Sequence, residues 1–353
     1  MHDDITARRK DEHLDLCAKE EVAPAGNSTL FDDVRLVHCA MPELELAQVD
    51  LSVSFMGKTL KAPLLLTGMT GGTERAGQVN RDVAAVAEEF GVAFGVGSQR
   101  AMAERPELTE TFAVRGVAAN TVVLGNLGIV QAARMTSDQI RRLMESIGAD
   151  GLAIHLNPGQ ELSQPEGDRD FQRGYFTITA LAKAFGDRLI VKETGCGVSP
   201  EVARRLVECG VKNIDVSGLG GTSWVRVEQL RSSGVAREVA SQFSSWGIPT
   251  AAAVASVRRA TGTDVRLVAS GGMRSGLDVA KALALGADLG GLALPVFKAH
   301  QAGGRDAVRT VLQTVIAALR QAMALTGSKD VAELRRKPRV ITGELRDWLV
   351  ALA

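Results

Sequence analysis

A cluster of polar side chains at residues 155–161 is the part of this sequence best suited to chemistry. The apolar run Gly151–Ile154 predicts a buried strand, and the residues released after it include His155, Asn157, Gln160 and Glu161. In parallel α/β folds, ligands bind at the edge where the strands end. A plain turn would need only Gly, Asn or Asp, so we expect this cluster to bind a ligand.

Glu161 is the best candidate for a metal ligand. A single carboxylate does not make a dedicated metal cage, but Mg²⁺ is commonly held by one or two carboxylates together with substrate phosphates and water. The basic run Arg8–Lys10 could fold over the same phosphates. These residues favour a diphosphate substrate. The alternative is an ordinary surface carboxylate and a solvated charge run.

Glycines late in the chain predict a phosphate site. Gly271 and Gly272 follow an apolar run, and a helix is expected to start near Gly276. Glycines let backbone N–H groups approach a phosphate closely, and a helix N-terminus is positive. Barrels commonly build such sites after their seventh and eighth strands. We therefore expect a phosphate-bearing cofactor here, with a tight turn packed under a helix as the simpler alternative.

Lys192 ends another apolar run, in a place where lysine is rarely buried unless it is paired. We interpret it as a cation beside an anionic cofactor ring or a carbonyl oxygen, and a structural ion pair is the alternative. Neutral hydrogen-bonding side chains follow other runs, namely Thr67, Ser98, Asn126, Ser217 and Thr222. Together they suit a flat heteroaromatic ring with several carbonyls and ring nitrogens, which a flavin provides.

The elements that must position these residues repeat along the chain. Eight short apolar runs alternate with helical stretches, at Leu64–Met69, Val92–Val96, Val122–Leu124, Gly151–His155, Leu189–Lys192, Ile214–Val216, Leu267–Ala269 and Leu289–Leu294. Ser199 is a good N-cap for one of the helices. Eight such units predict an α/β protein with a (β/α)8 TIM barrel over residues 62–353, ending in a helical tail. An open doubly wound sheet is the alternative.

Three segments lie outside the repeats. Residues 1–61 are expected to form an N-terminal extension that contributes to the substrate site, with short strands around Leu44–Val49 and Leu51–Phe55. Leu219–Gly247 is a candidate lid or interface loop. Arg305–Leu325 is expected to form a long closing helix, with the remaining tail packed beneath or beside the barrel.

Composition excludes several classes of protein. The 41 basic residues balance 41 acidic ones, whereas nucleic-acid and membrane-surface binding depend on a basic excess. No stretch approaches the roughly 18 apolar residues of a membrane span. The four cysteines form no Cys-x-x-Cys pair, and no apolar leader opens the chain. We expect a cytoplasmic enzyme without nucleic-acid or membrane partners.

These motifs together resemble type 2 isopentenyl-diphosphate isomerase, a flavin-dependent family, over nearly the whole chain. The resemblance includes the N-terminal segment 9–13, Met69-Thr70-Gly71-Gly72, the 155–161 segment and the residues 215–224. It implies interconversion of isopentenyl and dimethylallyl diphosphate by an allylic proton shift. It also implies reduced FMN, Mg²⁺, NADPH as the reductant of FMN, and a homo-oligomer (tetramer or octamer).

The resemblance also assigns residues by position. FMN would be held by Thr67, Gly68, Met69, Thr70, Ser98, Asn126, Lys192, Ser217 and Thr222, with its phosphate on Gly271, Gly272, Met273 and Arg274 and with Leu292 and Ala293 beside it. The substrate would be bound by Arg9, Lys10, Ser98, Gln99, Arg100, His155 and Gln160. The candidate catalytic residues are His155, Asn157, Gln160 and Lys192, and Glu161 would hold Mg²⁺.

Three other classes are weighed against this interpretation. An FMN-dependent 2-hydroxy-acid oxidase or dehydrogenase would need a histidine base and arginines at a late strand end, and the sixth and seventh strand ends carry no histidine. A barrel resembling inosine-monophosphate dehydrogenase would need a cysteine nucleophile within residues 215–224, which contain none. Cys196 is expected to be a packed small residue. A non-enzymatic flavin-binding protein stays open until turnover is tested.

Overall fold

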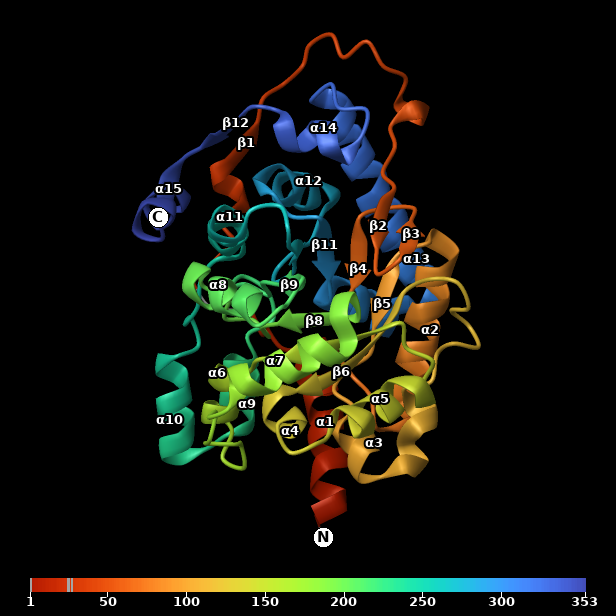
Figure 1. The fold of residues 1–353 in the computed structure, drawn as a ribbon, viewed down its shortest axis with the longest axis vertical. Coiled ribbons are helices and arrows are strands. Elements are labelled where there is room, and N and C mark those ends of the chain that lie inside the picture. The colour runs from red at the N-terminus through yellow and green to blue at the C-terminus, as the bar shows by residue number, and fades with distance from the viewer. Residues whose placement is uncertain (1, 24–25, 27) are drawn as a thin grey trace.

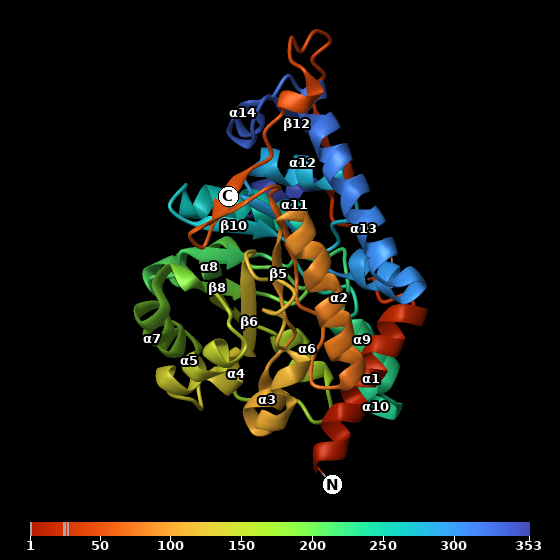
Figure 2. The same cartoon turned by 90° about the vertical axis from the view of Figure 1, so that its right-hand side faces the viewer.

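Eight parallel strands close into a barrel, as the sequence predicts (Figures 1 and 2). The computed structural model describes residues 2–23, 26 and 28–353, and within the first helix it describes the side chains of residues 10 and 12–19. The barrel strands are β4 (Leu64–Leu66), β5 (Ala93–Gly95), β6 (Val123–Gly128), β7 (Gly151–His155), β8 (Leu189–Lys192), β9 (Asn213–Asp215), β10 (Arg266–Ala269) and β11 (Leu289–Leu292).

The strand positions agree with the apolar runs, while several ends differ. β4 stops at Leu66, three residues earlier than expected, so Thr67–Met69 form part of a loop. β6 extends through Gly128 because its polar end stays paired with β7, where Gly128 is aligned with His155. The last run splits, since Leu294 already begins a helix.

Helices surround the barrel and bury their apolar faces against its strands (Figure 1). The main ones are α2 (Glu74–Phe90), α5 (Ser137–Ser146), α7 (Gly174–Phe185), α8 (Pro200–Glu208), α11 (Thr250–Thr261) and α12 (Gly276–Leu285). Five of the shorter helical segments are α3 (Arg100–Glu104), α4 (Ile129–Ala132), α6 (Pro158–Ser163) and the 3₁₀ segments Pro106–Thr111 and Gly186–Arg188. Ser199 caps α8 as predicted, because its side chain accepts a hydrogen bond from Val202 N.

The N-terminal extension covers both ends of the barrel. Helix α1 (His2–Lys19) contacts α9 and α13 (Figure 2). The hairpin β2 (Val53–Phe55) and β3 (Lys58–Leu60) places Phe55 and Leu60 against interior side chains of the barrel. Strand β1 (Val34–Leu36), which follows a 3₁₀ turn at Phe31–Asp33, pairs with a strand of the C-terminal tail.

The strand predicted at Leu44–Val49 is wrong. Leu46–Gln48 forms a 3₁₀ turn instead. Leu46 is 50% exposed whereas Val49 is 3% exposed, so the apolar residues of this stretch do not share one buried face that would favour strand pairing. The second predicted strand, Leu51–Phe55, is shorter in the structure, where it is β2.

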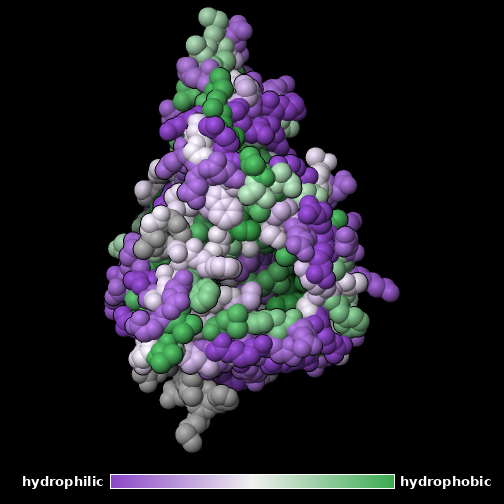
Figure 3. Space-filling view, turned by 90° about the vertical axis from the view of Figure 1, so that its left-hand side faces the viewer, coloured by the Kyte–Doolittle hydropathy of each residue, from purple (hydrophilic) through white to green (hydrophobic). Residues whose placement is uncertain are grey.

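The excursion at residues 219–247 is mostly helical. It contains α9 (Trp224–Arg231) and α10 (Gly234–Gln242). Apolar side chains gather on the surface over α10, as the lower left of Figure 3 shows, and they include Val235, Val239, Phe243 and Trp246. Packing within one chain leaves these side chains exposed.

The chain ends in a long helix and an interlocked tail. Helix α13 (Leu294–Leu325) contains the predicted closing helix Arg305–Leu325, separated from its first part by non-helical backbone at Gly303 and Gly304. The tail consists of α14 (Val331–Arg336), β12 (Arg339–Ile341) and α15 (Gly343–Ala351). Strand β12 pairs antiparallel with β1, and α15 contacts α11. Within the described residues, no helix is long and apolar enough to cross a membrane.

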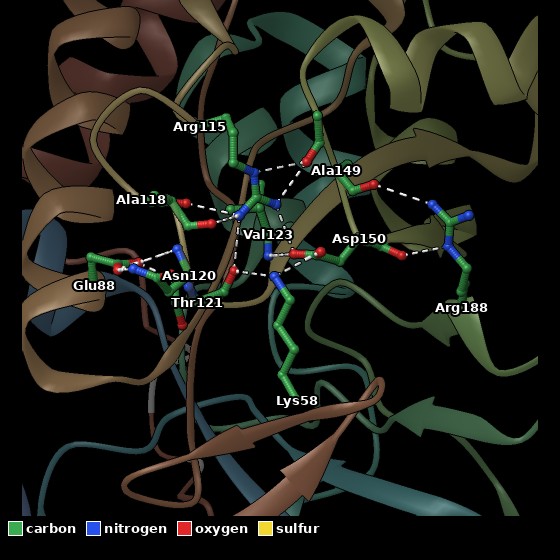
Figure 4. A network of polar contacts seen from close by, with 12 residues as sticks. Lys58, Glu88, Arg115, Ala118, Asn120, Thr121, Val123, Ala149, Asp150 and Arg188 are labelled. Carbon is green, nitrogen blue, oxygen red and sulfur yellow. Dashed lines mark hydrogen bonds and ion pairs between the residues drawn. The ribbon is translucent and has the colours of Figure 1, made fainter.

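An aspartate cluster fastens the end of the barrel where the strands begin (Figure 4). Asp150 precedes β7, and its carboxylate accepts hydrogen bonds from Arg115 Nη2 at 2.7 Å and Val123 N at 2.8 Å. Lys58 of the β2–β3 hairpin completes the cluster, with Nζ 2.8 Å from Asp150 Oδ1. The hairpin is therefore attached to the barrel by charge as well as by apolar packing.

A second cluster repeats this arrangement halfway around the barrel. Asp288 precedes β11, which lies four strands from β7 in the closed order. Its Oδ2 accepts hydrogen bonds from Arg258 Nη2 and Leu267 N, both at 2.7 Å, and Arg335 Nη2 bonds Oδ1 at 2.8 Å. Both aspartates follow a Gly-Ala pair. The two halves of the barrel thus contain the same kind of aspartate cluster, at the end opposite the polar residues 155–161.

Candidate active site

A cavity of about 430 Å³ opens at the end of the barrel where the strands terminate. Its walls come from all parts of the chain, including the polar cluster and the glycine-rich segments predicted above. The predicted site residues that line it are Lys10, Thr67, Gly68, Met69, Thr70, Ser98, Arg100, Asn126, His155, Asn157, Gln160, Glu161, Lys192, Ser217, Thr222, Gly271, Gly272, Met273, Arg274 and Ala293. Residues up to about 280 positions apart in the sequence meet at this one rim.

The alternation of strand side chains explains why these polar groups meet. Leu65, Leu124, Ala153, Ile190 and Val268 pack together inside the barrel. Side chains two positions further along a strand face the same side, and these are Thr67, Asn126, His155, Lys192 and Ser270, all of which line the cavity. The apolar interior of the barrel is therefore capped by one polar layer, which forms the floor of the site.

Hydrogen bonds fix two members of this layer. Asn126 Nδ2 donates to Val96 O at 3.0 Å, which directs Oδ1 of the same amide toward His155 Nδ1 at 2.8 Å. The network therefore assigns the imidazole proton to Nδ1 and leaves the lone pair on Nε2. A neutral His155 with this tautomer can accept a hydrogen bond or a proton in the cavity.

The 155–161 segment holds its carboxylate in a defined orientation. Asn157 Nδ2 donates to Glu161 Oε1 at 2.9 Å, and Asp168 N donates to Glu161 Oε2 at 2.8 Å. Glu161 is 8% exposed and lines the cavity. Each of its oxygens keeps a second lone pair, so the carboxylate fits a Mg²⁺ ion whose other ligands are substrate phosphates and water. No group of three or more potential metal ligands occurs in the described part of the chain.

The glycines after β10 form a cradle at the cavity wall. Gly271 and Gly272 have φ values of +100° and +83°, which favour glycine. A Cβ on Gly271 would lie 2.1 Å from Gly218 O, so no side chain fits. The expected helix α12 begins at Gly276, but Asp278 Oδ2 already accepts hydrogen bonds from Arg274 N and Ser275 N. A phosphate would therefore depend on the backbone of the glycines more than on the helix end.

Unpartnered hydroxyls support a bound flavin at this wall. Thr70 Oγ1 and Thr222 Oγ1 are buried and line the cavity, yet neither has a hydrogen-bond partner among the described residues. Buried polar groups are normally satisfied, so these two hydroxyls call for a polar ligand. A cavity with two such hydroxyls, the partly buried Lys192 and a glycine cradle fits FMN.

Comparisons with known proteins identify the family. A model described as FMN-dependent dehydrogenase matches residues 163–341. Isopentenyl-diphosphate delta-isomerase from Pyrococcus horikoshii is 43% identical over 99% of this chain and 96% of its own, and the enzyme of that name from Metallosphaera sedula is 45% identical over 97% and 94%. The chain belongs to the FMN-dependent, type 2 isopentenyl-diphosphate delta-isomerases.

Solved structures confirm the fold of this type 2 isomerase. A mandelate oxidase with (S)-2-phenylpropionate has a TM-score of 0.67 at 20% identity, covering 95% of this chain and 96% of its own. A mandelate oxidase with 3,3-difluoro-2-hydroxy-3-phenylpropionic acid has a TM-score of 0.66 at 18% identity, with 95% and 98% covered. At such identities the likeness concerns the barrel fold alone.

The isomerase buries several titratable groups beneath its cavity. Burial, followed by the positive charges of Lys192 and Lys10, lowers the pKa of His155 to about 3. Burial also lowers the pKa of Lys192, although the negative charges of Asp215 and Glu193 oppose this. Burial raises the pKa of Glu193 to about 7, against three backbone hydrogen bonds that lower it. His155 is therefore neutral near pH 7, whereas the carboxylates near Lys192 oppose the lowering of its pKa by burial.

Helix α1 brings residues to the isomerase site that sequence analysis did not assign to it. His13 Nε2 lies 2.9 Å from Glu228 Oε1, and the His13 ring packs edge-on against Trp224 at 5.2 Å. Arg231 Nη1 donates to Glu228 Oε2 at 2.5 Å, and Gln160 Nε2 donates to Glu228 Oε1 at 3.3 Å. The only sequence signal was that His13 and Trp224 lie within segments that resemble the family.

Among the described residues, two predicted ones, Gln99 and Leu292, do not line the cavity. Gln99 is fully buried behind it, where Oε1 accepts a hydrogen bond from Asn126 N at 2.9 Å and Nε2 donates to Leu143 O at 3.1 Å. Gln99 therefore positions Asn126 and does not reach a ligand in this structure. Leu292 lines a second cavity of about 30 Å³ beside the first. The side chain of Arg9 lies outside the described residues.

Proposed function

We propose that this protein interconverts isopentenyl diphosphate and dimethylallyl diphosphate by an allylic proton shift, using reduced FMN and Mg²⁺. The observation that carries the proposal is the 43–45% identity to enzymes of that name over 97–99% of the chain. The reaction adds a proton to one carbon and removes one from another without net oxidation. A site for it needs a held diphosphate, a dry prenyl pocket and groups able to exchange protons.

The flavin end of the site is proposed to lie over the polar layer. When bound, reduced FMN supplies an electron-rich ring that can stabilise positive charge on the prenyl carbons and exchange protons. Lys192 would hold the ring by its charge, with Thr67, Ser98, Asn126, Ser217 and Thr222 as neutral hydrogen-bonding partners. The cradle at Gly271 and Gly272 would take the phosphate, together with Met273 and Arg274.

The diphosphate end is proposed to lie between Glu161 and helix α1. Lys10 and Arg100 both line the cavity, and Lys10 Nζ donates to Ser98 O at 3.5 Å. Mg²⁺ on Glu161 and these cations would neutralise the diphosphate and fix its position, which can lower a barrier by several kcal/mol. Helix α1 closes over the mouth through its contact with Glu228 and so excludes water from the prenyl chain. Arg9 and Gln99 stay predicted substrate contacts.

Proton transfer is proposed to involve the residues that face the prenyl chain. His155, Asn157 and Gln160 line the cavity beside Lys192. The Nε2 lone pair of neutral His155 can accept a proton. The amide of Gln160, which is held by Glu228 at 3.3 Å, can orient the reacting carbon or a water.

The decisive experiment is anaerobic turnover of isopentenyl diphosphate. The FMN-loaded protein, reduced with dithionite and supplied with Mg²⁺, is expected to form dimethylallyl diphosphate, and the oxidised protein is expected to be inactive. NADPH should replace dithionite, and Glu161→Gln should raise the Mg²⁺ concentration needed. No dimethylallyl product under reducing conditions would defeat the proposal.

A 2-hydroxy-acid dehydrogenase is the competing function, because the family model carries that kind of description. Among the described residues, the histidines that line the cavity are His13 on α1 and His155 on β7, so none follows β9 or β10. We expect no flavin reduction by lactate or mandelate. A cytoplasmic homo-oligomer, tetramer or octamer, completes the proposal.

A further inference from the structure

We infer that Asp215 is the positioning residue of Lys192, the counter-ion that keeps the ammonium group protonated and directed at the cavity floor. The inference deepens the proposed function, since it rests on the placement of FMN against Lys192. It also assigns a role to a carboxylate that does not itself line the cavity.

Strand register places the two side chains together. β8 and β9 are parallel neighbours, and Lys192 is aligned with Asp215. Aligned residues of parallel strands face the same side of the sheet, and the Lys192 side of β8 faces the cavity. Asp215 Oδ1 accepts a hydrogen bond from Ser270 Oγ at 2.7 Å, and Ser270 belongs to the same polar layer. Asp215 is thus the buried neighbour of Lys192 within the floor of the site.

One carboxylate oxygen of Asp215 has no hydrogen-bond partner among the described residues. The residue is 0% exposed. Oδ1 accepts hydrogen bonds from Ser270 Oγ and from Ser217 N, but Oδ2 is buried and has no partner within the described residues. A buried carboxylate oxygen without a donor is costly. A lysine ammonium on the adjacent strand is the group that can relieve this cost, and it needs a counter-ion for the same reason.

The other charged groups around Lys192 do not serve this role equally well. Glu193 follows Lys192 directly, just beyond the end of β8, and its carboxylate is held by the backbone. Its Oε2 already accepts hydrogen bonds from Thr194 N and Gly195 N at 2.6 Å and from Cys196 N. His155 and Lys10 carry no negative charge. Lys192 Nζ donates to the backbone Glu193 O, which leaves its other two protons for Asp215 and a ligand.

The first test uses the protein without FMN, so that it does not depend on the proposed function. Lys192 lines the open cavity, and only an unprotonated amine reacts with an acylating reagent. In Asp215→Asn, the labelling rate of Lys192 followed by mass spectrometry should rise by about tenfold for each pKa unit that Lys192 loses. Glu193→Gln is the matched control, because it removes a buried carboxylate next to Lys192 that already accepts three backbone hydrogen bonds, and it should raise the rate far less. Equal rates in Asp215→Asn and the unaltered protein would overturn the inference.

The second test measures the midpoint potential of bound FMN. Lys192→Met removes a cation beside the ring, so the reduced, more negative flavin is destabilised and the potential should become more negative. Asp215→Asn should shift it the same way, because Lys192 then loses its proton or its position. The double variant should add little to Lys192→Met, as expected for residues that act as a pair. Additive shifts, or a positive shift in Asp215→Asn, would refute the pairing.

The two tests separate their failures. If Lys192→Met leaves the flavin potential unchanged while Asp215→Asn still accelerates labelling, the placement of FMN against Lys192 is wrong and the pairing stands. If Asp215→Asn abolishes turnover by the FMN-loaded protein but leaves the labelling rate of Lys192 unchanged, the pairing is contradicted and the placement of FMN is not. Circular dichroism and urea unfolding of each variant show whether the fold is retained.

Discussion

Replacing Asp150 should destabilise the barrel and leave its cavity intact. The Asp150→Ala change removes the shared acceptor of Lys58, Arg115 and Val123 N, which lie 2.7–2.8 Å from the carboxylate (Figure 4). Breaking a fully buried pair on one side costs about 3–5 kcal/mol. The Asp150, Arg115 and Lys58 side chains are 22%, 28% and 33% exposed, so solvent screening reduces this to about 2–3 kcal/mol.

Equilibrium urea unfolding measures this loss. Asp187→Ala is the matched control, because its carboxylate is 73% exposed and also has a lysine partner, Lys212 at 3.1 Å; it should change the free energy of unfolding by less than about 0.5 kcal/mol. Asp288→Ala should cost about as much as Asp150→Ala. Because the two clusters lie four strands apart, the losses should add. Equal effects of Asp150→Ala and Asp187→Ala would refute the reasoning.

The same carboxylate predicts a pH dependence. Burial raises the pKa of Asp150, but Lys58, the Val123 N–H group and Arg115 outweigh burial and hold it below its ordinary 3.8. A pKa that is lower in the folded protein adds stability above pH 3.8, and this stability is lost as the pH falls through the folded value. The difference between the unaltered protein and Asp150→Ala should therefore be constant near neutral pH and shrink below about pH 4.

Three further predictions concern the cavity. The lowered pKa of His155, about 3, predicts that its imidazole NMR signals do not titrate between pH 8 and 5; a midpoint near 6.5 would contradict its burial. Burial raises the pKa of Cys17 and Cys196 to about 12. Neither thiol should therefore react with a thiol reagent at pH 7 in the folded protein. Rapid labelling of Cys196 would support a nucleophilic role for this residue. Gly271→Ala should abolish FMN loading, because its Cβ would lie 2.1 Å from Gly218 O. Gly262→Ala is the control, since Gly262 also has a positive φ but a Cβ there would meet nothing within 4 Å, and this variant should load FMN normally. Normal flavin absorbance in Gly271→Ala would disprove the cradle.

The barrel could be predicted from sequence because its signals are local. Each strand is a short apolar run, and Ser199 and Gly91 mark helix ends through their own chemistry. The prediction failed at Leu44–Val49, where a similar apolar pattern forms a 3₁₀ turn with Leu46 exposed and Val49 buried. Strand ends were also misplaced, since β6 continues through Gly125 and Asn126 only because β7 offers a partner. The pairing of β6 with β7 is a tertiary contact, and the sequence of β6 alone does not indicate it.

The candidate site could be predicted in outline for a different reason. Polar residues just beyond apolar runs must emerge at one edge, so Asn126, His155 and Lys192 could be assigned to the cavity without knowing their partners. Contacts between distant residues could not be assigned. The His13–Glu228 pair joins residues 215 positions apart, and no property of either segment identifies the other. Gln99 shows the converse, because a strand-end position does not show whether its side chain faces a ligand or lies behind it.

The interior layers of the barrel separate stability from chemistry. At the end where the strands begin, Asp150 and Asp288 are both surrounded by cations and N–H donors. At the cavity end, Asp215 Oδ2, Thr70 Oγ1 and Thr222 Oγ1 are buried without partners among the described residues. Each unsatisfied polar group at the cavity end lowers the stability of the protein until a ligand binds. The satisfied polar groups at the opposite end of the barrel help the fold to tolerate this loss. Thr70 and Thr222 line the cavity and Asp215 is aligned with Lys192 on the adjacent strand, so the unpaired atoms locate the site more sharply than the residue types do.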